Sequence, residues 1–425
     1  KSPIGNVSFR TNISKKSNTI FIGSNGNHFM DYSLIDDGNG VYAVNSINGK
    51  IKNHFQGEKF GDMDVNGVLI HDNKLFFGND NDEFLCTDLK GNLIYRLPTS
   101  GDIEFEPVLI KLKNKNVIVY GTETGELRAI NPSNGKTVWK YFHEKFEGWK
   151  EGENRTLFKV KMHFYASRDF FFDKPVLKDV NNDDVSDLIF TIGSYDIIII
   201  DGKTGKDLHT IDIGSKESIN DGFYSQLWKT APLIIEDMGE VIAVVPFRKW
   251  ESSEVTQSEL RCFTLNGKLI KKIKLDPKFF SSCGNRIGVN EKAVLFDRGL
   301  VDFSNGLDAF KITEFTGFPE VENNSKWYIP FSNNIASNQF IKVNNEICLL
   351  SIYENGDLRK NSTLAIISVS SGKVIKLYNL PSTSEFQPVI GDFNKDGKAD
   401  VLVGCHDGLL YDIDLNIPSS DILNK

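Results

Sequence analysis

The sequence has few cysteines and prolines for its length, and it has no long apolar run. Its 425 residues include 5 cysteines and 13 prolines. The cysteines form no CxxC pair, so neither a zinc knuckle nor a disulfide framework is indicated, and we expect most of them to be small buried strand residues. The purest apolar run, Ile197–Ile200, is far shorter than the roughly 18 residues that a membrane helix needs. We therefore expect a soluble chain without a membrane span.

An excess of basic residues is also missing, because 49 Lys and Arg against 57 Asp and Glu give a formal net charge of −8. A nucleic-acid binder needs a basic face to displace counterions, so no nucleic acid is expected as a partner. With 31 Phe and 35 Gly, the composition excludes collagen, coiled coils and low-complexity disorder. Residue 1 is Lys rather than Met, which is compatible with a removed signal peptide, and we expect a secreted or periplasmic protein.

A repeated unit of roughly 40 to 45 residues runs through the chain. Each copy joins two strand-like runs through a short Asn/Ser/Thr/Lys-Gly turn, as in Leu127–Trp139. Glycine supplies the positive φ that such tight hairpins demand. The turn glycines are Gly49, Gly91, Gly135, Gly205, Gly267 and Gly372. A second element, in which proline opens a strand as in Glu104–Val108, precedes several of these hairpins and is followed by a further apolar run.

Four short strands per unit predict an all-β fold, a single β-propeller of eight four-stranded blades. The expected blades are 6–57, 61–98, 102–142, 174–214, 226–275, 280–320, 326–381 and 384–425, with 142–173 as an inserted loop. Seven blades with a split closure are the alternative, because the sixth unit lacks a clear signature and the eighth lacks an obvious outer strand.

The Asn-Gly-Lys-x-x-Trp form at Asn134–Trp139 resembles the pyrroloquinoline-quinone-like propeller repeat. Quinoprotein dehydrogenases of this type carry a docking tryptophan in almost every repeat and often stack their cofactor on an adjacent cysteine pair. Here only Trp139 occupies that place and no two cysteines adjoin. The resemblance therefore implies the architecture, and a quinone cofactor is not expected.

Two units carry Asp-x-Asn-x-Asp-x-x-x-Asp between their first and second strands, which resembles integrin-type FG-GAP calcium loops. The resemblance implies one structural Ca²⁺ per loop, held by side-chain oxygens at positions 1, 3, 5 and 9 and by the carbonyl at position 7. The expected ligands are Asp179, Asn181, Asp183, Val185 and Asp187, then Asp392, Asn394, Asp396, Lys398 and Asp400. Three carboxylates within nine residues repel one another, and a cation removes that cost. A plain acidic turn is the alternative for each loop.

In a four-stranded blade these loops occupy one face, and we expect function on the opposite face, where the long insertions fall. The insertions are Ser24–Gly40, Tyr141–Asp173, Ser215–Lys229, Phe247–Glu259 and Tyr353–Ser362. The second is aromatic and locally basic, with seven Lys or Arg against four Glu from Lys140 to Arg168. Such a surface suits sugars or anionic polymers, and a lid that packs its own aromatic rings is the alternative.

His, Tyr and Arg side chains on the insertion face suit β-elimination from a uronate. That reaction needs a base, an acid for the leaving oxygen, and a cation that neutralises the carboxylate, for which the Arg fork is well shaped. The architecture and residue inventory are similar to those of ulvan and rhamnogalacturonan lyases. The candidate catalytic residues are His163 as base, Tyr224 as acid and Arg248 as carboxylate partner, with His143 and Tyr165 as substitutes; the candidate substrate-binding residues are Arg168, Lys249, Trp250, Trp149, Tyr195 and Arg359.

The expected function is thus a polysaccharide lyase that degrades an anionic polysaccharide or oligosaccharide. A non-catalytic propeller that binds glycan or protein partners is the alternative. Paired acids at the starts of blades, Glu104, Glu106 and Glu385, suit a glycosidase if two of them lie about 5 to 9.5 Å apart. Repetition of the Glu-Phe-x-Pro motif favours a structural role for these acids.

Overall fold

In the computed structural model, most of the described residues form β-strands. The described residues are 2–3, 13–25, 38–55, 63–142, 174–192, 196–213, 232–237, 240–251, 254–275, 286–290, 293–297, 306–311, 327–330, 332–354, 361–384, 388–405 and 407–423. Within these ranges there are 32 strands and a single turn of 3₁₀ helix at Ser419–Asp421. No helix in this part of the chain has the length and apolar character needed to cross a membrane.

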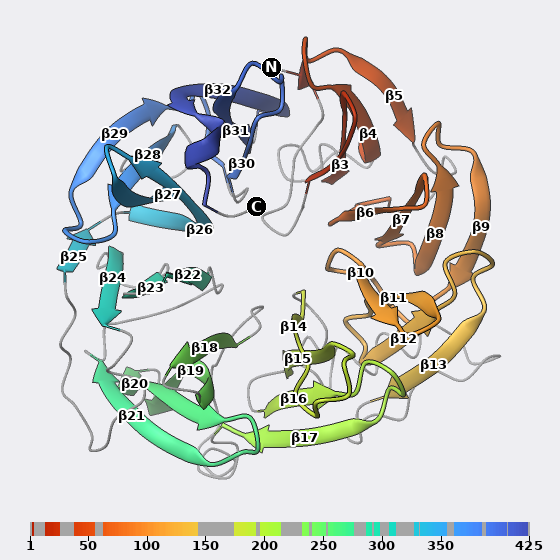
Figure 1. The fold of residues 1–425 in the computed structure, drawn as a ribbon, viewed down its shortest axis with the longest axis horizontal. Coiled ribbons are helices and arrows are strands. Elements are labelled where there is room, and N and C mark those ends of the chain that lie inside the picture. Colours follow the sequence, from red (N-terminus) through yellow and green to blue (C-terminus); the bar gives the residue numbers. More distant parts are fainter. Residues whose placement is uncertain are drawn as a thin grey trace. The chain divides into compact units, whose positions relative to one another are not determined.

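The chain divides into two compact units, of which the first comprises residues 1–174, 202–206 and 382–422. Three of its sheets consist of four consecutive antiparallel strands (Figure 1). They are β2–β5 (Ile13–Lys16, Thr19–Asn25, Asn39–Asn45, Ile51–Phe55), β6–β9 (Val68–His71, Lys74–Asn79, Glu83–Asp88, Leu93–Pro98) and β10–β13 (Val108–Leu112, Lys115–Gly121, Glu126–Ile130, Thr137–Phe142). A fourth sheet joins β30 (Val389–Gly391), β31 (Lys398–Gly404) and β32 (Leu409–Pro418) to β1 (Ser2–Pro3). The two ends of the chain therefore share one sheet.

The second unit comprises residues 175–201, 207–381 and 423–425, and it holds four sheets of consecutive antiparallel strands. They are β14–β17 (Val176–Lys178, Asp187–Ile192, Asp196–Ile200, Asp207–Asp212), β18–β21 (Leu233–Asp237, Glu240–Glu251, Glu254–Thr264, Leu269–Leu275), β22–β25 (Arg286–Asn290, Ala293–Asp297, Gly306–Lys311, Trp327–Pro330) and β26–β29 (Ser332–Val343, Glu346–Glu354, Ser362–Ser368, Val374–Asn379). The all-β prediction is confirmed, and seven of the sheets follow the predicted order of four successive strands.

The middle strands of the sheets are buried, whereas the outer strands are partly exposed. All residues of β16, the apolar run noted in the sequence, are buried, and so are those of β12 and β28. The outer strand β9 instead exposes residues along its whole length. A middle strand that is covered on both faces need not alternate apolar and polar residues, as the run Ile197–Ile200 of β16 shows.

One hairpin geometry recurs at the turn glycines predicted from the sequence. All six have φ between 68° and 93°, which confirms that these turns need the left-handed backbone. Just before each turn the pairing of the third and fourth strands shifts by one residue, as it does between Ala129 and Ile130. The same shift occurs in five other sheets. A β-bulge repeated at one place shows that the units are structurally equivalent.

Hydrophobic clusters fill the space between successive sheets within each unit. In unit 1, Phe21 of β3 and Phe77 of β7 share one cluster, and the rings of Phe84 and Tyr120 stack with centroids 4.1 Å apart in the next. In unit 2, Ile197 of β16 lies in a cluster with residues of β19 and β20. The core therefore consists of several layers between sheets rather than one central cluster.

An apolar side chain on the outer strand of one sheet packs against the turn glycine of the next. The pairs are Phe55 with Gly91, Tyr95 with Gly135, Trp139 with Gly205 and Ile211 with Gly267. A Cβ atom at Gly205 would lie 2.5 Å from Trp139 Cε3, and Trp139 Nε1 donates a hydrogen bond to the Gly202 carbonyl at 3.2 Å. The docking position seen in the sequence at Trp139 is thus filled by Phe, Tyr or Ile in other sheets.

Two sequence predictions about strands are wrong. Trp327–Pro330 was placed at the start of the seventh blade, but β25 pairs with β24 and completes the sheet before it. Phe247–Glu259 was expected to be an irregular insertion, but its described residues belong to β19 and β20, in which Arg248 pairs with Ser258. Phe247, Trp250, Val255 and Thr256 favour extended strands, so the described residues of this segment continue the sheet.

Candidate metal centres

The two acidic loops each connect the first strand of a sheet to the second. Asp179–Asp187 links β14 to β15 in unit 2, and Asp392–Asp400 links β30 to β31 in unit 1. The final aspartate of each loop lies in the second strand and is buried, with Asp187 0% and Asp400 1% exposed. A carboxylate is buried in this way only when other groups compensate for the lost hydration.

The same four side-chain to backbone hydrogen bonds organise both loops. The aspartate at position 1 accepts a hydrogen bond from the N–H at position 6. In the first loop Asp184 N–H donates to Asp179 at 2.9 Å, and in the second Gly397 N–H donates to Asp392 at 3.2 Å. The side chain at position 3 accepts from the N–H at position 5, at 3.0 Å in the first loop and 2.9 Å in the second. The side chain at position 5 accepts from the N–H at position 7, again at 3.0 and 2.9 Å. The carboxylate at position 9 accepts from the N–H at position 2, at 2.8 Å in the first loop and 2.9 Å in the second. The two loops, from different units, therefore fold in the same way.

Two residues in each loop have a left-handed backbone. They are Asn182 and Asp184, with φ of 59° and 63°, and Lys395 and Gly397, with φ of 67° and 85°. Asn and Asp tolerate this region better than other residues with a side chain. Asp184 accordingly takes the conformation that Gly397 takes, and the absence of glycine at position 6 does not change the first loop.

The carboxylates of the second loop lie close enough to influence one another. Burial raises the pKa of Asp400, and the neighbouring Asp396 and Asp392 raise it further, against the lowering effect of the backbone N–H groups of Phe393 and Asn394. The Oδ1 atom of Asp392 is buried and has no hydrogen-bond partner among the described residues. A cation at this place would offset both the repulsion and the unpaired oxygen.

The donor atoms of the loops are of the type that calcium prefers, since all are carboxylate, amide or carbonyl oxygens. Within the described part of the chain, no three His, Cys, Asp or Glu side chains form a ready-made metal cluster. Each loop would instead combine carboxylates with an Asn side chain and a main-chain carbonyl. The second loop fits a cation better than the first, because both Oδ atoms of Asp179 accept backbone N–H groups whereas Asp392 Oδ1 does not.

Lys15 of β2, which belongs to no motif in the sequence, contacts the second loop. Its Nζ donates to the carbonyls of Asp392 and Phe393 at 2.8 and 3.0 Å, and it lies 5.2 Å from the centroid of the Phe393 ring. Partial burial lowers the pKa of Lys15, while the carboxylates of Asp392 and Asp400 act in the opposite direction. Because 377 residues separate Lys15 from Asp392, no local signal could have revealed this contact.

Most of the predicted catalytic and substrate-binding residues lie outside the described residues. These are His143, Trp149, His163, Tyr165, Arg168, Tyr195, Tyr224 and Arg359. The other three, Arg248, Lys249 and Trp250, lie on β19, and the pairing register shifts between Lys249 and Trp250. The structure thus places the backbone of these three residues on one strand. That all the predicted catalytic and substrate-binding residues lie close together stays a prediction.

The paired acids at the starts of blades make structural contacts. Glu104 accepts a hydrogen bond from Asn66 Nδ2 at 3.0 Å, and Glu106, which is buried, forms an ion pair with Lys174 Nζ at 2.9 Å. Glu385 lies outside the described residues. These contacts agree with the structural interpretation of the Glu-Phe-x-Pro motif.

Two buried ion pairs were missed in the sequence although their residues repeat. Arg128 Nε donates to Glu126 Oε1, and Arg261 Nε donates to Glu259 Oε1, both at 2.5 Å. Each arginine also donates to a carbonyl at the end of the outer strand of the preceding sheet: that of Pro98, the last residue of β9, at 3.4 Å, or that of Ile213, the residue after β17, at 2.7 Å. The repeated Glu-Leu-Arg tripeptide was the available signal.

Solved structures of low sequence identity share this fold. BamB from Moraxella catarrhalis is 11% identical, with a TM-score of 0.56 over 96% of this chain and 97% of that chain. Sqt1 from Saccharomyces cerevisiae is 10% identical, with a TM-score of 0.57 over 97% and 96%. A quinohemoprotein alcohol dehydrogenase from Pseudomonas putida HK5 is 11% identical, with a TM-score of 0.56 over 94% and 70%.

No known family model matches the sequence, and no curated protein matches it significantly. The dehydrogenase and BamB are β-propellers. Together with the four-stranded antiparallel sheets, these similarities show a β-propeller fold. At such identities they show the fold alone, because one fold carries many activities.

Proposed function

We propose that the chain is a calcium-stabilised β-propeller in which each acidic loop holds one Ca²⁺. The observation that carries this proposal is the set of four hydrogen bonds that Asp179–Asp187 and Asp392–Asp400 share, supported by the buried, unpaired Oδ1 atom of Asp392. Bound calcium would neutralise the crowded carboxylates and fix the first hairpin of its sheet. Eight blades, the last completed by β1, are part of the same proposal.

Calorimetric titration of the chelator-treated chain with CaCl₂ tests the metal sites. We expect two sites per chain, with one lost in Asp183→Asn and the other lost in Asp396→Asn. Asp72→Asn is the matched control, because its side chain is 77% exposed and lies outside both loops. Calcium at about 100 times its Kd stabilises the folded chain by about 2.7 kcal/mol per site, so chelation should lower the Tm by several degrees. An unchanged melting curve in full chelator contradicts the assignment.

We further propose that this propeller acts on an anionic, uronate-containing polysaccharide as a β-eliminating lyase. His163 would remove the C5 proton, Tyr224 would protonate the leaving oxygen, and Arg248 would neutralise the carboxylate, with His143 and Tyr165 as substitutes. The local excess of basic and aromatic residues from Lys140 to Arg168 supports an anionic carbohydrate ligand. A secreted or periplasmic location belongs to the proposal, since such polymers are extracellular.

Ultraviolet absorbance of the unsaturated uronate product, followed over a panel of acidic polysaccharides, tests the lyase proposal. His163→Ala, Tyr224→Phe and Arg248→Lys should each lower the rate at least about 10²-fold without changing the Tm. Lys113→Met, in the turn after β10, is the control for a lost surface charge. Binding of a polysaccharide without any product would instead identify the alternative, a non-catalytic glycan-binding propeller.

A further inference from the structure

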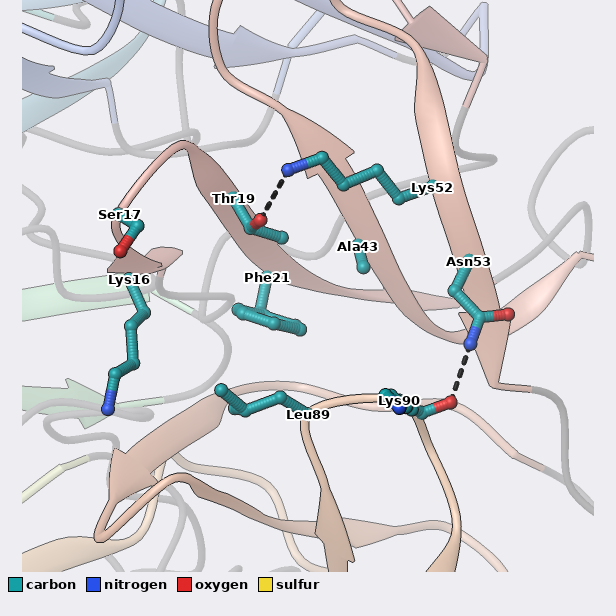
Figure 2. Close-up of a pocket in the computed structure, with 9 residues that line it drawn as sticks. All are labelled: Lys16, Ser17, Thr19, Phe21, Ala43, Lys52, Asn53, Leu89 and Lys90. Carbon is teal, nitrogen blue, oxygen red and sulfur yellow. Dashed lines mark hydrogen bonds between the residues drawn. The ribbon is translucent and has the colours of Figure 1, made fainter.

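A pocket of about 400 Å³ lies in unit 1 between the sheet β2–β5 and the turn that connects β8 to β9 (Figure 2). Its apolar lining comes from Phe21, Ala43 and Leu89, which belong to or adjoin the cluster between these two sheets. Its polar lining includes three lysines, Lys16, Lys52 and Lys90, and no Asp or Glu. Pockets of this size with an apolar lining and a few polar groups are typical of small-ligand sites.

Two of the three lysines donate hydrogen bonds to neutral partners. Lys52 Nζ donates to Thr19 Oγ1 at 2.6 Å and to the Asn18 carbonyl at 2.9 Å, and Lys16 Nζ donates to Asn73 Oδ1. None of the three ammonium groups forms a salt bridge with a carboxylate among the described residues. Three positive charges, with no carboxylate among the lining residues, therefore line one pocket of a chain whose net charge is −8.

A second feature fixes the shape of the pocket. Asn53 Nδ2 donates to the Lys90 carbonyl at 2.6 Å, and a Cβ atom at Gly91 would lie 1.9 Å from Phe55 Cδ1. The β8–β9 turn is thus held against β5, so Lys90 stays opposite Lys52. Figure 2 shows Lys16, Lys52 and Lys90 on different sides of the apolar lining.

We propose that this pocket binds an oxyanion ester, a sulfate or phosphate group carried on a sugar-sized ring. Lysine ammonium groups act as point charges, so three of them can meet the oxygens of a tetrahedral oxyanion from separate directions. The ring would cover Leu89 and Ala43, and the ester oxygens would meet the lysines. This site does not depend on the lyase proposal, and none of its residues belongs to a calcium loop.

Titration calorimetry of the full chain with glucose 6-sulfate and glucose 6-phosphate tests the proposal, with glucose as the uncharged control. We expect both esters to bind, more weakly as salt is added, and glucose not to bind. Lys52→Met and Lys90→Met should each weaken binding about fivefold or more. Lys113→Met removes an exposed lysine of the same unit elsewhere and should leave the affinity unchanged. A preference for one ester identifies sulfated or phosphorylated carbohydrate as the source.

Acetylation of lysines, mapped by mass spectrometry, locates the ligand independently of substitution. Saturating ester should protect Lys52 and Lys90 and should leave Lys113 as reactive as before. Binding of neither ester, equal loss of affinity in Lys113→Met, or absence of protection at Lys52 and Lys90 would overturn the proposal. Loss of lyase activity or of calcium binding would not affect it.

Discussion

At the scale of single residues, the contact between Trp139 and Gly205 shows that this turn requires glycine for two separate reasons. Its φ of 71° disfavours any side chain, and the indole ring occupies the space where a Cβ would stand. Gly267 has a φ of 93°, but the nearest atom to its Cβ position is 3.8 Å away. Alanine substitutions at the two glycines therefore distinguish the cost of backbone strain from the cost of disturbed packing.

Gly205→Ala should lower the free energy of unfolding by about 3 kcal/mol, because about 1–2 kcal/mol of left-handed strain adds to the displacement of the indole. Gly267→Ala should show the strain alone, about 1–2 kcal/mol. Urea denaturation followed by tryptophan fluorescence and by circular dichroism measures both. Equal losses in the two variants would mean that the aromatic contact contributes nothing.

Four of the five cysteines are described, and all four are buried and free. Burial raises the pKa of Cys262 and of Cys348 to about 12, with the Glu346 charge adding to the effect on Cys348, and it also raises the pKa of Cys86 and Cys405. At pH 8 a thiol with a pKa of about 12 is ionised in about one molecule in 10⁴, and the thiolate is the reactive form.

We therefore expect no reaction of these thiols with Ellman's reagent in the folded protein. The measurement uses a Cys283→Ser variant, because Cys283 lies outside the described residues. Four thiols per chain should react once guanidinium unfolds the protein. A thiol that reacts rapidly in the folded chain would contradict the buried-strand interpretation of the cysteines.

At the scale of elements, the buried pair of Glu259 and Arg261 on β20 connects two sheets. Arg261 spans from Glu259 to the Ile213 carbonyl beyond the end of β17, and Lys272 Nζ lies 3.8 Å from the same Glu259 oxygen. Both side chains of the pair are 3% exposed. Removal of Arg261 weakens the charge compensation of the buried Glu259, whereas removal of both partners leaves neither buried charge.

Arg261→Met should cost about 3–5 kcal/mol of stability, and Glu259→Leu combined with Arg261→Met should recover much of that loss. Arg96→Met is the matched control, since Arg96 pairs with Glu83 at 3.2 Å but is 42% exposed, and its loss should cost less than about 1 kcal/mol. Thermal melts of the four proteins provide the comparison. A double variant no more stable than Arg261→Met would show that the arginine acts only through the Ile213 carbonyl.

The elements that the sequence predicted are those set by neighbouring residues. The turn glycines and the acidic loops depend on backbone geometry within about ten residues, and the structure has the expected turns. Contacts such as Lys15 with Asp392, or Glu106 with Lys174, depend on which sheets lie side by side, which no single segment encodes. The Glu-Leu-Arg pairs were missed because charged residues on a strand are usually solvated, and only the packing of the sheets shows them buried.

At the scale of the whole molecule, the two compact units each contain one acidic loop. The loop in unit 2 joins β14 to β15, and the loop in unit 1 joins β30 to β31, in the sheet that also contains β1. Calcium in the second loop would therefore stabilise the sheet in which the two ends of the chain meet. Because cation binding favours only the folded form of its own sheet, each ion should protect mainly the unit that binds it.

Hydrogen exchange measured by mass spectrometry, with and without calcium, tests this division. Calcium should slow exchange at β30–β32 in the natural chain and in Asp183→Asn, but no longer in Asp396→Asn. The converse pattern is expected at β14–β17, where Asp183→Asn should remove the protection. Asp72→Asn should behave like the natural chain at both places. Loss of protection in both units from either single substitution would show that the units are coupled in one cooperative transition, and that each ion stabilises the whole chain.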